Sequence, residues 1–91
     1  WSLILAEVVP GRAAELIARG RSFGESRRVC NVHWLSDIEE GRIVASAVFA
    51  RLQADAAFRA DVAAARTEVE SLAASLPKPD CARESAALAI P

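Results

Sequence analysis

Apolar residues recur at helical spacing along most of the chain, and the pattern predicts a series of helices. An apolar segment over residues 1–9 ends at Pro10, which can open the next helix because the first helical position needs no amide donor. From Pro10 to about Arg28, an apolar stripe alternates with arginine and glutamate. Residues 29–35 then break the pattern and are expected to form a turn.

The second half of the chain predicts three more helices. Ser36-Asp37-Ile38-Glu39 is a capping-box pattern, so a helix is expected from Ser36 to about Ala54. Pro77 and Pro79 end a further helix that starts near Asp55, and residues 80–88 can form a short terminal helix. The helix after Asp55 has the cleanest apolar stripe, with spacings of four, three, four and three: Phe58, Val62, Ala65, Val69 and Leu72. No strand is predicted, and the expected fold is an all-α helical bundle.

Gly20 and Gly24 lie one turn apart in the helix expected over residues 10–28. This spacing can allow another helix to approach closely. The simpler interpretation is a weakened or bent helix, because each glycine lowers helix propensity by about 1 kcal/mol relative to alanine.

Composition indicates one small globular domain. The chain has 91 residues, of which 53% are hydrophobic and 25% charged. Its net charge of −1 argues against bulk binding to nucleic acid or to an anionic membrane, although residues 1–28 carry five Arg against three Glu. No apolar stretch approaches the roughly 20 residues that span a bilayer. Because residues 1–6 read like the interior of a helix, we expect residues 1–91 to be the carboxy-terminal portion of one larger domain whose upstream part is absent.

The two cysteines leave two interpretations open. A disulfide between Cys30 and Cys81 would close a 51-residue loop, worth about 4 kcal/mol in the chain-entropy model, and would suit an exported protein. The alternative is two separate buried thiols. One histidine and two distant cysteines do not make a four-ligand zinc site, so zinc is not expected. No cofactor is predicted.

Candidate chemistry is concentrated in residues 26–37, which contain the only histidine, His33. On an unbroken helix Arg27 and His33 would point about 240° apart, so only a turn between them lets both face one anion. Asp37, four residues after His33, can accept from the Nδ1–H group and leave Nε2 free to attack phosphorus. Arg27 can bind two phosphoryl oxygens as a fork. The alternative is a structural histidine beside Trp34, with Arg27 and Asp37 forming an ordinary salt bridge.

A family resemblance favours the catalytic interpretation. Ser26-Arg27, five residues, His33, three residues and Asp37 resemble the third signature of the type-2 phosphatidic acid phosphatase and vanadium haloperoxidase superfamily. The wider segment from Ala18 to Arg42 is similar to bacterial class A non-specific acid phosphatases, and the similarity continues into the Phe58 helix.

This resemblance implies an all-helical, metal-free enzyme that hydrolyses phosphomonoesters, prefers acidic pH and is exported to the periplasm. It implies that His33 is the nucleophile that forms a phosphohistidine and that Asp37 orients it. Arg27 would bind the phosphate, with Ser26 in a supporting role.

Two family signatures have no match in the chain. The first pairs a lysine with a downstream Arg-Pro, and the only lysine here is Lys78. The second is a Pro-Ser-Gly-His element whose histidine protonates the leaving group. We expect both to lie upstream of Trp1, and we expect the 91 residues to be inactive until the missing amino-terminal part is attached or bound.

Other functions remain open at this stage. A vanadate-dependent haloperoxidase of the same superfamily would use the same residues to hold vanadate. A superfamily lipid phosphatase would require membrane-spanning segments. A non-enzymatic helical module would use the stripe from Phe58 to Leu72 to pack on a partner. Helices separated from a larger bundle would also expose apolar stripes, so copies of the chain are expected to associate.

Overall fold

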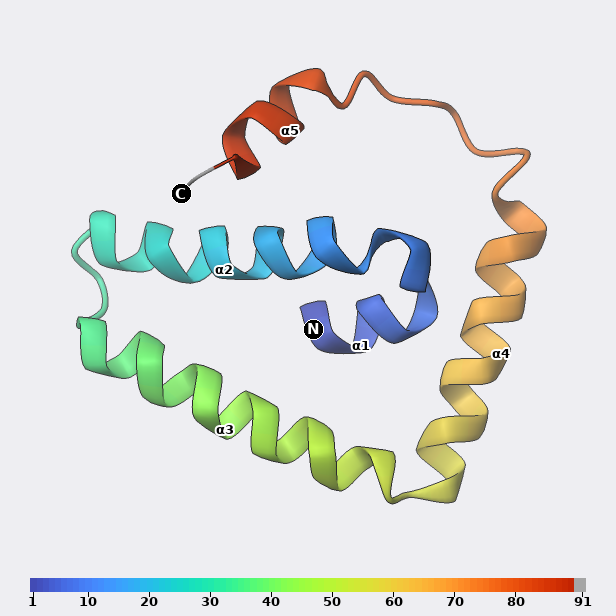
Figure 1. The fold of residues 1–91 in the computed structure, drawn as a ribbon, viewed down its shortest axis with the longest axis horizontal. Coiled ribbons are helices and arrows are strands. Elements are labelled where there is room, and N and C mark those ends of the chain that lie inside the picture. The colour runs from blue at the N-terminus through green and yellow to red at the C-terminus, as the bar shows by residue number, and fades with distance from the viewer. Residues whose placement is uncertain (90–91) are drawn as a thin grey trace.

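A computed structural model describes residues 1–89 of the chain, and over this range every regular element is a helix (Figure 1). The all-α fold class is therefore confirmed. In chain order the elements are α1 (Ser2–Val8), the short 3-10 helix η1 (Pro10–Arg12), α2 (Ala13–Val29), α3 (Leu35–Gln53), α4 (Ala56–Leu72) and α5 (Ala82–Leu88).

The helices form an open frame around α1 (Figure 1). α2 and α3 are joined by a turn and extend to the same side of it, with opposite chain directions. α1 lies between the two helices at the ends far from this turn. α4 crosses that open end and packs on α1, whereas a linker over residues 73–81 carries the chain back to α5 beside α2. The turn between α2 and α3 is thus one corner of the frame.

Gly20 is where α1 and α2 approach each other. A Cβ atom at Gly20 would overlap the Ser2 hydroxyl and lie 2.7 Å from the Ser2 Cβ atom. The interpretation of Gly20 as a simple weak point in the helix is therefore wrong, because its missing side chain makes room for α1. At Gly24 a Cβ atom would lie 3.5 Å from Ile38 of α3, which is ordinary contact.

The amino terminus of α3 differs from the predicted capping box. The helix begins at Leu35, and the backbone N–H of Trp34 donates to the Asp37 carboxylate at 2.8 Å. Ser36 lies inside the first turn instead of capping it. Asp37 is three residues after Trp34, so its carboxylate occupies the position from which a side chain reaches back to the N-cap amide. Predicting Ser36 as the cap was wrong by two residues.

The predicted start of α4 is confirmed in detail. Asp55 is the N-cap, and its carboxylate accepts the backbone N–H of Phe58 at 2.9 Å. Of the predicted stripe, Phe58, Val62 and Ala65 are half-buried, while the last two positions, Val69 and Leu72, are exposed.

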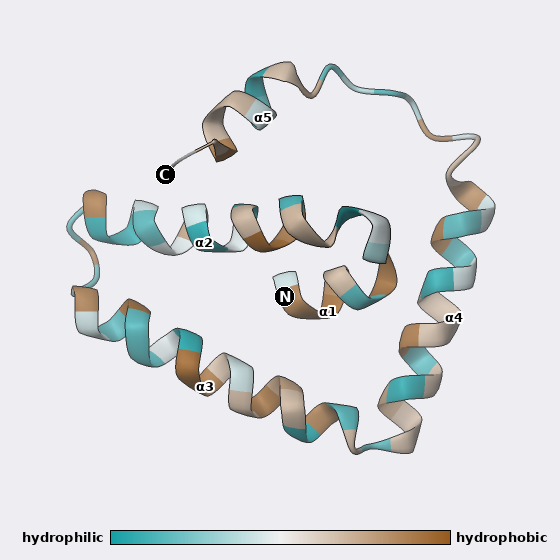
Figure 2. Ribbon diagram, viewed as in Figure 1, coloured by the Kyte–Doolittle hydropathy of each residue, from teal (hydrophilic) through white to brown (hydrophobic). Residues whose placement is uncertain are grey.

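The apolar core of residues 1–89 is small. Val8 and Ile38 are its buried side chains. Hydrophobic positions recur along α3 (Figure 2), and several of its large apolar side chains are exposed. The radius of gyration is 15.2 Å, against about 12 Å for a compact domain of this length. The accessible surface is 7149 Å², whereas a compact chain of this mass would expose about 5,100 Å². The frame therefore leaves apolar surface open to solvent.

Both cysteines are free and exposed in the structure. The predicted alternative of two buried thiols is therefore wrong, and no Cys30–Cys81 disulfide is formed. Among residues 1–89, none of the helices combines the length and the hydropathy that crossing a bilayer requires.

Candidate active site

The turn after α2 brings the backbones of Arg27 and His33 together. The carbonyl oxygen of Arg27 accepts the backbone N–H groups of Val32 at 3.1 Å and His33 at 3.3 Å. Asn31 enables the reversal with a φ of 58°, a left-handed conformation that asparagine tolerates better than most residues. The predicted turn is confirmed, with α2 ending at Val29 and α3 starting at Leu35.

His33 and Asp37 face each other across this turn. The imidazole Nδ1 lies 3.4 Å from Asp37 Oδ2, slightly beyond the usual hydrogen-bond length. The same carboxylate oxygen accepts the Trp34 backbone N–H at 2.8 Å, and this contact fixes where the carboxylate lies. The side chains of His33 and Asp37 are 53% and 46% exposed, so the imidazole is accessible to a solute. The pair can therefore orient one ring nitrogen while the other faces outward.

Arg27 lies on the last turn of α2 and is positioned by its own helix. Its guanidinium carbon stands 5.2 Å from the centre of the Phe23 ring, and its Nε–H donates to the Ser26 hydroxyl at 3.3 Å. Ser26 in turn donates to the Phe23 carbonyl at 2.7 Å. Within the described residues no carboxylate lies within salt-bridge distance of Arg27, so the alternative of an Arg27–Asp37 salt bridge does not hold.

Sequence reasoning missed Glu25, which has the most perturbed carboxylate at this corner. Arg42 of α3 donates to Glu25 Oε1 at 2.7 Å, and the Arg28 guanidinium lies 3.2 Å from Oε2. The hydrogen bond from Arg42, followed by the charges of Arg28 and Arg42, lowers the pKa of Glu25, and these effects outweigh the opposing effect of desolvation. Glu25 thus pairs with two arginines, and among residues 1–89 Arg27 has no carboxylate partner. Only the tertiary contact with Arg42, 17 residues away, reveals this arrangement.

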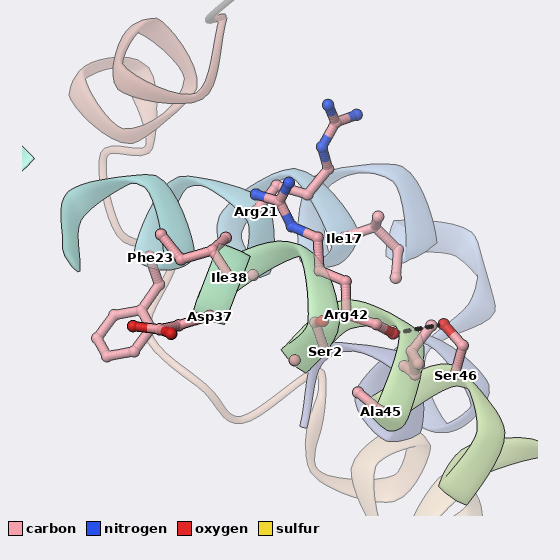
Figure 3. Close-up of a pocket in the computed structure, with 13 residues that line it drawn as sticks. Ser2, Ile17, Arg21, Phe23, Asp37, Ile38, Arg42, Ala45 and Ser46 are labelled. Carbon is pink, nitrogen blue, oxygen red and sulfur yellow. Dashed lines mark hydrogen bonds between the residues drawn. The ribbon is translucent and has the colours of Figure 1, made fainter. Parts of the chain in front are cut away.

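A cavity of about 330 Å³ lies between α1, α2 and α3. Asp37 and Phe23 border it at one end and Arg42 extends across it from α3, but most of its wall is apolar (Figure 3). His33 and Arg27 do not line it. A phosphate in this cavity would not meet the imidazole, so the candidate site is the exposed face of the corner.

The structure therefore places the predicted residues in two pairs. His33 lies with Asp37, and Arg27 lies with Ser26, and the Arg27 carbonyl links the pairs through the His33 amide. Among residues 1–89, no three His, Cys, Asp or Glu side chains gather as metal ligands would.

Sequence comparison finds bacterial relatives for most of the chain. It is 49% identical over 82 residues to an acid phosphatase of Zymomonas mobilis, a match that covers 88% of this chain and 31% of the relative. It is 44% identical over 79 residues to a non-specific acid phosphatase of Salmonella typhimurium, covering 87% of this chain and 32% of the relative. A non-specific acid phosphatase of Salmonella typhi is 46% identical over 68 residues, covering 75% of this chain and 27% of the relative.

The chain thus spans about a third of the length of the curated relatives it matches. No protein-family model matches the chain. No solved structure matches it either. The resemblance read from the sequence is nevertheless confirmed, since identities of 44% and 49% extend over nearly nine-tenths of the chain. The chain is homologous to the bacterial non-specific acid phosphatases.

Proposed function

We propose that the chain supplies the nucleophile portion of a metal-independent acid phosphatase that hydrolyses phosphomonoesters through a phosphohistidine. The observation that supports this most directly is the exposed His33 imidazole with Nδ1 3.4 Å from the Asp37 carboxylate. Arg27 has no carboxylate partner among the described residues, and its backbone carbonyl accepts the His33 amide at 3.3 Å.

Each residue has a distinct part in the proposed reaction. Asp37 holds the proton on Nδ1, which keeps the lone pair on Nε2. Nε2 attacks phosphorus, and a P–N bond forms as the bond to the ester oxygen breaks. Arg27 binds two of the phosphoryl oxygens and offsets the charge that develops on them. Water then attacks the phosphohistidine, and inorganic phosphate leaves with the P–N bond broken.

The proposed reaction also needs a group that the chain does not provide. The departing alkoxide must take a proton, and general acid catalysis of this kind contributes about 10²–10⁴ in rate. His33 is the only histidine in the chain, and it is occupied as the nucleophile. We therefore propose that the 91 residues have no appreciable activity alone. An amino-terminal part, corresponding to a region of the relatives outside the matched segment, would supply the missing general acid.

The resemblance also leads us to propose that the protein acts in the periplasm. Cell fractionation of the bacterial host with antibodies against the chain tests this location independently of activity. Recovery of the protein only in the cytosolic fraction would contradict it.

A segment exchange tests the proposed function directly. The 82 residues of the Zymomonas mobilis acid phosphatase that match this chain are replaced by the chain itself. The chimera is assayed with 4-nitrophenyl phosphate beside its His33→Ala variant and an Asp61→Asn control on the exposed surface of α4. We expect His33→Ala to lower kcat by about 10³ or more, by analogy with loss of other covalent nucleophiles, and the control to match the parent.

The covalent intermediate gives a second measurement. Rapid quenching with labelled substrate should trap a phosphoryl group that is stable to base, labile to acid and bound to the peptide containing His33. An active chimera that retains its rate after His33→Ala would contradict the proposal. Bromide oxidation by the chimera with added vanadate, in the absence of phosphatase activity, would favour a haloperoxidase instead.

A further inference from the structure

Two contacts between α2 and α3 lie next to the candidate site. The first is apolar: Ile38, one of the buried residues, lies against the backbone of α2 at Gly24. The second is ionic: Arg42, one turn after Ile38, reaches across to Glu25 at 2.7 Å. These two contacts set how α3 lies against α2 near the turn.

The ionic contact is flanked by the candidate site residues on both helices. Glu25 is two residues before Arg27 on α2, and Arg42 is five residues after Asp37 on α3. Arg27 and the His33–Asp37 pair therefore lie next to the helix segments that this ion pair connects. A shift of one helix along the other would change the position of the guanidinium relative to the imidazole.

We propose that Glu25 and Arg42 are positioning residues, whose ion pair between α2 and α3 holds Arg27 and the His33–Asp37 pair in register around one phosphoryl group. This inference rests on the proposed function of His33 as a nucleophile. Misplacement of reacting groups by about 1 Å can lower the rate by up to about 10²-fold. The Glu25–Arg42 ion pair can therefore affect the rate although neither residue touches the substrate.

Three features of Glu25 suit this task. Glu25 contacts two guanidinium groups, from Arg28 on its own helix and Arg42 on the facing helix, so its carboxylate is held from both sides. Its side chain is 34% exposed, less than those of the other carboxylates in ion pairs. The lowered pKa of Glu25 also keeps the carboxylate ionised at acidic pH, and the pair is lost only as the pH falls through that lowered value.

A double-mutant cycle in the chimera tests the pair. We expect Glu25→Ala and Arg42→Ala each to lower kcat about tenfold at saturating substrate, and the double variant to lose no more than either single variant. Arg42→Lys, which keeps a cation facing Glu25, should recover part of the loss. The matched control is the exposed pair of Arg12 and Glu15 at the start of α2, where the same substitutions should leave kcat unchanged.

Two outcomes would overturn the inference: single variants within about twofold of the parent kcat, or losses that multiply in the double variant. Unfolding midpoints of all variants are measured alongside, because a merely structural pair would lower the midpoint without a selective effect on kcat.

Hydrogen–deuterium exchange separates this inference from the proposed function. The peptide over residues 30–34 contains the Val32 and His33 amides that donate to the Arg27 carbonyl. In Glu25→Ala we expect this peptide to exchange about tenfold faster than in the parent, while Glu15→Ala leaves it unchanged. If the parent chimera is inactive, the proposed function fails. Exchange in the turn still decides whether Glu25 holds it, and unchanged exchange would reject the positioning role.

Discussion

At the scale of single residues, Asp37 makes two contacts that can be separated. It accepts the Trp34 amide at the start of α3, and it faces the His33 ring nitrogen. The first contact needs only an acceptor atom, whereas support of an imidazole that becomes positively charged needs a negative charge. Fold and proposed chemistry therefore place different demands on one carboxylate.

Asp37→Asn tests this separation. The amide oxygen can still accept the Trp34 N–H, so we expect the unfolding midpoint of the chimera to change little. The lost charge should lower kcat by on the order of 10² or more. Thermal unfolding followed by circular dichroism and steady-state kinetics give the two values. A large loss of stability with unchanged kcat would show that Asp37 serves only to start the helix.

At the scale of elements, three glycines within helices differ in whether the packing around them leaves room for a side chain. Gly20 leaves no room for a Cβ atom because of Ser2, whereas Gly41 has nothing within 4 Å. Gly24 has ordinary contacts with Ile38 and Arg42. The same substitution should therefore have opposite effects along neighbouring helices.

Gly41→Ala should stabilise the chain by about 0.5–1 kcal/mol, because alanine loses less backbone entropy in a helix. Gly20→Ala should destabilise it by about 1–3 kcal/mol, because α1 must move away from α2. Urea unfolding measures both free energies. Adding Ser2→Gly to Gly20→Ala should recover stability, and equal effects at Gly20 and Gly41 would contradict the observed packing of α1.

The starts of α3 and α4 show which helix boundaries the local sequence can predict. Asp55 and the stripe after it predicted α4 correctly, because an N-cap carboxylate and its amide lie three residues apart in the chain. The cap of α3 was mispredicted, because both Ser36 and Asp37 suit a helix start and local pattern alone does not rank them. In the structure Trp34 is the N-cap, and its amide donates to Asp37 three residues later.

At the scale of the whole molecule, the open frame leaves several large apolar residues exposed to solvent. Ile43, Val44 and Val48 of α3 are each more than half exposed, and Phe23 and Trp34 near the corner are more exposed still. Exposed large apolar side chains favour association when they gather into a patch. The hydrophobic fraction of 53% is therefore not matched by a core within residues 1–89.

We expect the purified 91-residue chain to self-associate and to bind a fluorescent apolar dye. Ile43→Lys combined with Val44→Lys should reduce both effects, since these side chains contribute to the exposed face of α3. Sedimentation velocity over a concentration series measures the first and dye fluorescence the second. Arg51→Lys, on the same helix, is the control. A compact monomer at every concentration would contradict the prediction.

The sequence alone determined the helical class and the turn after α2, because these follow from local periodicity and capping. It also predicted the residues of the candidate site, through a local motif within twelve positions. It also indicated the family, through residues that lie close together in the chain. What only the tertiary structure decided are contacts between distant segments: Ser2 against Gly20, Ile38 against Gly24, and Arg42 with Glu25. Local propensity carries no information on which faces meet, since that depends on how the helices pack. For the same reason, the pairing of Glu25 with Arg42 could not be predicted from the sequence.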